Sequence, residues 1–228
     1  MKMNATETDR IYASVARRYD RLTDLLSFGS GRFYRRKVAS WLDLPLGGIG
    51  VDIGAGTGGL ALAMQEKVGE TGRVIAIDRS PEMLAEAKRL GVRETVEGTF
   101  DSLPLEDNSV DGIASGYAIR YAPDLSRALA EMQRVLRPGG KIVLLEMAIP
   151  RSGLGRMAAS LLVRRCSPAA MTICCQSRGV GELMRHFWDS VASFPPMDEV
   201  VKCMESVGFR GVQGLGPWGM LTEFRARA

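Results

Sequence analysis

The chain has 228 residues, of which 46% are hydrophobic, and a formal net charge of +4, so it is long enough to bury one substantial core. It contains no run of about 18 uncharged apolar residues, and its first ten residues contain no apolar signal core, which predicts a cytoplasmic protein without a membrane-spanning helix. Four cysteines without a CxxC pair, together with a single histidine, make a poor ligand set, so no metal site is predicted.

The first predicted elements are two amphipathic helices, over residues 10–26 and 31–42. The sequence Ser27-Phe28-Gly29 separates them, and both helices carry arginine on their polar sides. We expect residues 1–45 to form a helical cap over a binding site in the remainder of the chain.

Strand and helix patterns then alternate. Short runs at residues 50–54, 74–78, 95–98, 112–115 and 141–146 predict strands, and the segments 59–67, 81–90 and 124–136 predict helices, with Ser80 capping the second of these helices. Such alternation is typical of an α/β fold with a doubly wound, mostly parallel sheet. A helix at about 197–207 and two final runs, 210–215 and 220–225, predict a terminal hairpin that brings the sheet to seven strands.

The segment 147–195 interrupts this alternation and is predicted to be a lid inserted after the fifth strand. Its first part, up to residue 181, contains five arginines and no acidic residue, next to an apolar stretch at 157–163. The flanks of the chain are basic and the middle is acidic, because residues 41–150 hold 11 basic and 16 acidic side chains. A basic and apolar lid predicts peripheral contact with an anionic membrane surface; an ordinary solvated lid helix is the alternative.

The glycine-rich turn VDIGAGTGG, which begins at Val51, identifies the binding site. Gly54, Gly56 and Gly58 have no Cβ atoms, so a ligand can approach the main chain there. The next strand ends at Asp78, a carboxylate suited to the hydroxyls of a ribose. These features predict a cofactor that contains a nucleoside.

Two classes of cofactor fit a turn of this kind. Gly54, Gly56 and Gly59 also match the dinucleotide pattern GxGxxG. Asp52 decides between the classes, because a carboxylate two positions before the first glycine suits a cationic ammonium group and is an odd neighbour for a pyrophosphate. The turn therefore favours S-adenosylmethionine.

Beyond this turn, the chain resembles the class I methyltransferases that use S-adenosylmethionine, and among them the ubiquinone/menaquinone C-methyltransferase family. The resemblance rests on RYDRLTDLLSFGSGRFYRR from Arg18, and on the segments EGTFDSLPLEDNSVDGI, RVLRPGGKIVLLE and DSVASFP in the same order. It implies a single Rossmann-like methyltransferase domain over residues 1–228.

The resemblance also implies roles for individual residues. Thr57, with Gly54 and Gly56, would contact the methionine part of the cofactor, and Asp78 the ribose. Thr99, Phe100 and Asp101 would flank the adenine, and Ser115 would end the fourth strand beside the methyl donor.

The acceptor side of the site departs from the family pattern. The segment Tyr117-Ala118-Ile119-Arg120-Tyr121 stands where relatives have an aromatic residue, Gly, an aliphatic residue, Arg and Asn. Arg120 is the candidate catalytic residue, either acting on a developing phenolate or forming a structural ion pair. His186, the single histidine, is a weaker candidate for a base.

The predicted reaction is C-methylation of a demethylated, lipophilic quinol in menaquinone or ubiquinone biosynthesis. An O- or N-methyltransferase for another small amphiphile, such as a phenol or a phospholipid amine, would share every cofactor residue. A cofactor-binding scaffold without catalysis is the third reading. Nucleic acid is not an expected partner, because no Asp/Asn-Pro-Pro-aromatic motif follows the fourth strand. A homodimer is compatible with the sequence.

Overall fold

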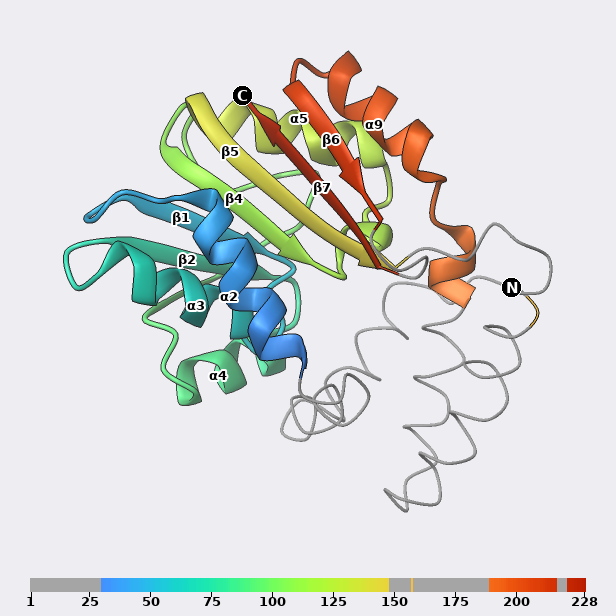
Figure 1. The fold of residues 1–228 in the computed structure, drawn as a ribbon. Helices are drawn as coiled ribbons and strands as arrows, with labels where there is room; N and C mark the ends of the chain where they lie inside the picture. Colours follow the sequence, from blue (N-terminus) through green and yellow to red (C-terminus); the bar gives the residue numbers. More distant parts are fainter. Residues whose placement is uncertain (1–29, 148–156, 158–188, 217–220) are drawn as a thin grey trace, which may run out of the picture.

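A seven-stranded sheet forms the centre of the molecule (Figure 1). The computed structural model describes residues 30–147, 157, 189–216 and 221–228. The strand order is β3-β2-β1-β4-β5-β7-β6. The strands are β1 (Ile49–Ile53), β2 (Arg73–Asp78), β3 (Glu94–Glu97), β4 (Val110–Gly116), β5 (Leu136–Met147), β6 (Arg210–Leu215) and β7 (Leu221–Arg227). Strands β1 to β5 pair in parallel, and β7 is antiparallel to both β5 and β6.

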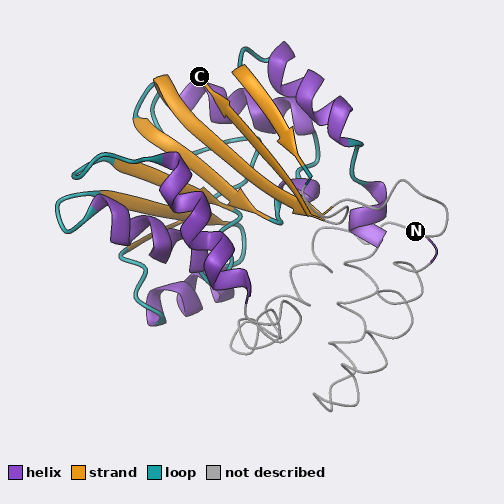
Figure 2. Cartoon of the chain, in the orientation of Figure 1, coloured by secondary structure: helices purple, strands orange, loops and turns teal. Residues whose placement is uncertain are grey.

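Helices cover both faces of this sheet (Figures 1 and 2). Helices α2 (Ser30–Leu42) and α3 (Gly59–Val68) pack on one face, and α5 (Leu125–Val135) and α9 (Met197–Ser206) on the other. Strand residues alternate between the two cores: Ile113 of β4 belongs to the core beneath α5 and α9, and Ala114 to the core beneath α2 and α3. Burial on both faces explains why the central strands are almost continuously apolar.

The predicted alternation of strands and helices is confirmed, with small changes at the ends of elements. Helix α4 (Pro81–Arg89) begins after Ser80, whose side chain accepts a hydrogen bond from the Met83 backbone N–H at 3.3 Å. Strand β5 starts five residues earlier than expected, at Leu136, because Leu136 already pairs with Val110 before the Arg-Pro-Gly-Gly segment, in which Gly139 has φ +81°. The register shift between Val110 and Gly112 accommodates the extra residues.

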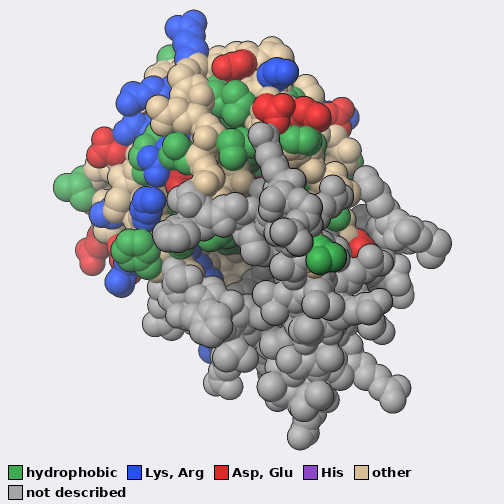
Figure 3. Space-filling view, turned by 45° about the vertical axis from the view of Figure 1, so that its right-hand side comes forward, with side chains coloured by type: hydrophobic (Ala, Val, Ile, Leu, Met, Phe, Trp, Pro, Cys, Tyr) green, Lys and Arg blue, Asp and Glu red, His purple; other side chains and the backbone are tan. Residues whose placement is uncertain are grey.

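The predicted helix at 10–26 and most of the predicted lid, 147–195, including His186, lie outside the described residues. In the part of the chain that is described, no helix is both long enough and apolar enough to cross a membrane. Acidic and basic side chains are interspersed over the described part of the face in Figure 3.

The topology also sets the position of a ligand site. Strand β1 pairs with β2 on one side and with β4 on the other, so the chain changes winding direction at β1. In open α/β sheets, ligands bind beyond the carboxyl ends of the strands at such a switch point. The glycine-rich turn follows β1 at this point.

Candidate active site

The turn after β1 is held close to β2 by its backbone. The N–H groups of Gly54 and Ala55 both donate to the Ile77 carbonyl, at 2.8 and 3.0 Å. Gly54 has φ +69°, and a Cβ atom there would lie 2.4 Å from the Ala118 Cβ and 2.9 Å from the Phe100 ring. Only glycine fits between these two walls, so the turn forms a cradle lined by backbone.

Asp78 fastens the turn to the end of β2. One carboxylate oxygen accepts from the Gly56 N–H at 2.8 Å, and the other from the Ser80 N–H at 2.9 Å. Burial raises the pKa of this carboxyl group, and these hydrogen bonds oppose the rise. Because each carboxylate oxygen can accept two hydrogen bonds, Asp78 keeps acceptor capacity for a ribose diol.

A pocket lies beside this turn, and it contains most of the predicted cofactor residues. Gly54, Gly56 and Asp78 line it. Thr99, Phe100 and Asp101 form a second part of its wall, as expected for an adenine site. On the β4 side the wall consists of Gly116, Tyr117, Ala118, Tyr121 and Pro123.

The predicted residue Ser115 does not line the pocket. It is fully buried, and its hydroxyl has no hydrogen-bond partner among the described residues. Its neighbour Gly116 lines the pocket instead. Successive strand residues face opposite sides of the sheet, so the Ser115 side chain points to the side opposite to the one that Gly116 faces.

Asp52 and Thr57 also lie behind the wall. Thr57 is buried in the turn. One Asp52 carboxylate oxygen accepts from the Ala61 N–H, in the first turn of α3, at 2.9 Å. Burial raises the pKa of Asp52 to about 7, with the neighbouring Asp78 adding to the rise and Arg35 of α2 opposing it. The Asp52 carboxylate does not line the pocket, so it could influence the ammonium group of a bound cofactor only through its charge, across the glycine-rich turn.

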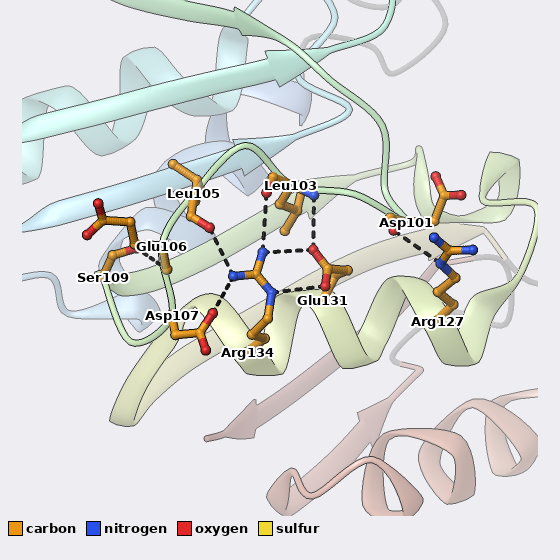
Figure 4. A network of polar contacts seen from close by, with 9 residues as sticks. All are labelled: Asp101, Leu103, Leu105, Glu106, Asp107, Ser109, Arg127, Glu131 and Arg134. Carbon is orange, nitrogen blue, oxygen red and sulfur yellow. Dashed lines mark hydrogen bonds and ion pairs between the residues drawn. The ribbon is translucent and has the colours of Figure 1, made fainter.

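A polar network anchors the Asp101 side of the pocket to α5 (Figure 4). Arg134 donates to the carbonyls of Leu103 and Leu105, at 3.2 and 3.0 Å, and to the carboxylate of Glu131. The Glu131 carboxylate in turn accepts from the Leu103 N–H at 3.0 Å. The hydrogen bond from Arg134 lowers the pKa of Glu131. The network holds a loop without regular secondary structure, and with it the wall at residues 99–101.

Arg120 is placed in a buried ion pair. It belongs to the short helix η1 (Ile119–Tyr121), and its guanidinium lies 2.7 Å from the carboxylate of Glu146 on β5. The side chains are 1% and 0% exposed. Arg120 also donates to the Ser190 hydroxyl at 3.1 Å, and that hydroxyl donates to the Tyr121 hydroxyl at 3.3 Å. Of the two readings of Arg120, this geometry matches the structural ion pair, and Glu146 is the partner that sequence reasoning had not named.

Comparison with known proteins gives the family. A model of the ubiE/COQ5 methyltransferase family matches residues 1–215. Demethylmenaquinone methyltransferase from Staphylococcus aureus (strain JH9) is 31% identical over 216 residues, which cover 93% of this chain and 88% of that protein. The chain belongs to the ubiE/COQ5 methyltransferase family. The predicted family is thereby confirmed.

Solved structures share the fold. A possible histamine N-methyltransferase from Thermotoga maritima has a TM-score of 0.67 at 24% identity, covering 96% of this chain and 99% of its own. A methyltransferase from Aquifex aeolicus has a TM-score of 0.61 at 20% identity, with 85% and 88% coverage. Phosphoethanolamine N-methyltransferase 2 from Haemonchus contortus, solved with S-adenosylmethionine, has a TM-score of 0.61 at 15% identity, with 85% and 52% coverage.

This member of the ubiE/COQ5 family is an S-adenosylmethionine-dependent methyltransferase with a Rossmann-like fold. The described residues fit that cofactor, because Gly54 leaves a cradle that a Cβ atom would fill and Asp78 retains free acceptor positions beside it. When bound, the cofactor supplies a methyl group on a sulfonium, which is the chemically activated group of the reaction. The protein has to bind it and align an acceptor.

Proposed function

We propose that the protein methylates a ring carbon of a demethylated quinol, a reaction that belongs to menaquinone or ubiquinone biosynthesis. The observation that carries this proposal is the similarity to demethylmenaquinone methyltransferase over 93% of the chain. The β4 side of the pocket supports it, because the rings of Tyr117 and Tyr121 with Pro123 make a wall suited to a flat, apolar acceptor.

We infer a simple division of labour between the two sides of the pocket. Gly54, Gly56 and Asp78 would hold the donor, while Thr99 to Asp101 would enclose its adenine. The wall of Tyr117 and Tyr121 would place the acceptor ring so that its carbon lies behind the methyl group, and this alignment is the main requirement of an in-line transfer.

The electron balance of the reaction is straightforward. The phenolic proton of the quinol leaves to water, and the electron pair of the resulting phenolate is shared with the ring carbon. That carbon bonds the methyl group while the carbon–sulfur electron pair remains on sulfur. Loss of the proton from the same ring carbon restores the aromatic ring as a phenolate, and its oxygen takes a proton back from water, so the reaction releases one proton in all.

Arg120 takes a positioning role in this proposal. Its charge is matched by Glu146, and through Ser190 it is connected to the hydroxyl of Tyr121 in the pocket wall. The pair would fix η1 and the helical residues 189–193 against the end of the sheet. It would thereby hold the acceptor wall in place without touching the reacting atoms.

The experiment is an assay of the full chain with isotopically labelled S-adenosylmethionine and two short-chain acceptors, a demethylated naphthoquinol and a demethylated benzoquinol. Mass spectrometry of the product, with fragmentation, distinguishes a methyl group on ring carbon from one on oxygen. We expect a C-methylated product from at least one acceptor. An O-methylated product, or donor binding without transfer to either quinol, would contradict the proposal.

A further inference from the structure

Tyr117 combines an unusual backbone with a position in the pocket wall. It follows β4 with φ +59°, in the left-handed region that side chains other than glycine rarely adopt. Its backbone N–H donates to the Leu145 carbonyl on β5 at 2.8 Å, which continues the sheet pairing through the strained residue. Strained residues of this kind cluster at functional sites, where the surrounding structure holds them in place.

The environment of the Tyr117 ring differs on its two sides. The ring packs against the apolar core beneath α2 and α3, and the residue also lines the pocket. Tyr34 and Arg35 of α2, Glu146 of β5 and Arg120 of η1 are the titratable and charged groups that act on its hydroxyl. Burial is the largest influence and raises the pKa of Tyr117 to about 12, so the hydroxyl keeps its proton at every pH at which the enzyme would work.

The hydroxyl of Tyr117 forms no hydrogen bond within the described part of the chain, in contrast to that of Tyr121, which accepts from Ser190 at 3.3 Å. The Tyr117 hydroxyl is not sealed in the interior: among the described residues, the buried side-chain atoms without a hydrogen-bond partner are the Ser115 Oγ and the Gln133 Oε1. A molecule that fills the pocket can therefore form a hydrogen bond with it. Both tyrosines in the wall keep an O–H donor, but the Tyr121 hydroxyl is already held by Ser190, whereas that of Tyr117 is not held by any hydrogen bond in the described part of the chain.

We propose that the Tyr117 hydroxyl donates a hydrogen bond to the acceptor oxygen that bears negative charge during methyl transfer. This inference rests on the proposed function, because it requires a phenolic acceptor. Tyr117 keeps its own proton throughout and acts neither as an acid nor as a base. A neutral donor aimed at a developing oxyanion stabilises it strongly in a site from which water is excluded. This hydrogen bond also orients the acceptor ring, because the acceptor oxygen must lie within hydrogen-bond distance of the Tyr117 hydroxyl.

The test is Tyr117→Phe, which keeps the ring and removes only the hydroxyl. We expect the affinity for S-adenosylmethionine, measured by calorimetry, to stay within about twofold, and kcat with the demethylated quinol to fall about 10- to 100-fold. The hydroxyl also favours the ionised acceptor, so the pH at half-maximal kcat should rise by about one to two units in the variant. A residue that only fills space would not move this pH profile.

Tyr34→Phe is the matched control, because Tyr34 faces Tyr117 from α2 and does not line the pocket; its pH profile should follow the wild type. An unchanged kcat and pH profile in Tyr117→Phe would overturn the inference. A more than tenfold loss of affinity for S-adenosylmethionine in Tyr117→Phe would also overturn the inference, because the hydroxyl would then bind the cofactor. If the wild type transfers no methyl group to any quinol, the proposed function fails and this inference fails with it.

Discussion

Asp52→Asn should change how the stability of the protein depends on pH. In the folded protein, the pKa of Asp52 is raised from 3.8 to about 7 by burial, while its carboxylate accepts a hydrogen bond from the Ala61 N–H. The folded state therefore keeps a proton that the unfolded state releases between about pH 4 and 7. Because the folded state binds more protons in this window, the free energy of unfolding falls as the pH rises through it.

The size of this effect follows from the pKa values. One pKa unit corresponds to about 1.4 kcal/mol, so a rise from 3.8 to about 7 corresponds to about 4 kcal/mol, lost mainly between pH 4 and 7. This is a large share of the roughly 5 to 15 kcal/mol that stabilises a typical domain. Asparagine can still accept from Ala61 but does not ionise, so the variant should escape the loss.

The assay is urea denaturation of wild type and variant at intervals from pH 4.5 to 8.5. Relative to wild type, Asp52→Asn should become more stable by a few kcal/mol as the pH rises, whatever its absolute stability at pH 4.5. Asp124→Asn is the control, because asparagine is an equally good cap at the start of α5 and Asp124 is exposed. Parallel curves for Asp52→Asn and wild type would refute the reasoning.

Three further changes probe the site. Asp78→Asn should weaken S-adenosylmethionine binding about 10- to 100-fold in calorimetry, because a charge-assisted hydrogen bond to the ribose is lost; unchanged affinity would move the ribose site elsewhere. Glu146→Gln should lower the free energy of unfolding by about 3 kcal/mol by leaving the buried Arg120 charge without its partner, whereas the double change Glu146→Leu with Arg120→Met should recover much of it; equal losses in both would argue against the ion pair. Gly54→Ala should abolish donor binding and lower the melting temperature, since the added Cβ would lie 2.4 Å from the Ala118 Cβ; normal binding would show that the turn can open.

Most of the fold could be predicted because its signals are local. Ser80 before Pro81 predicts the start of a helix, and the glycine cluster predicts a tight turn after a strand. The structure confirms both, as α4 and as the turn after β1. Strand β4 is an element in which local sequence signals do not identify the residue that lines the pocket. Both of its faces are buried, so its sequence has no polar and apolar alternation to tell which residue lines the pocket, and the structure has Gly116 there while the predicted Ser115 is buried.

The partner of Arg120 in its ion pair could not be predicted from the sequence, for a different reason. Glu146 is 26 residues from Arg120, and only the pairing of β4 with β5 brings it close. Any of several carboxylates could have served from composition alone. The sequence marks Asp52 as an unusual residue, but the direction of its carboxylate, toward the start of α3, depends on how α3 packs on β1. Tertiary packing decides such contacts.

The position of β7 has a consequence for how the polypeptide reaches its native state. This strand is made after β6, yet it lies between β5 and β6 in the sheet. Until β7 has been synthesised, the edge of β5 from Ile142 to Leu145 has no pairing partner on that side. More than 70 residues separate this edge from the start of β7 in the sequence. A nascent chain in this condition is prone to pair with other chains, and its final sheet can close only after translation has delivered Leu221–Arg227.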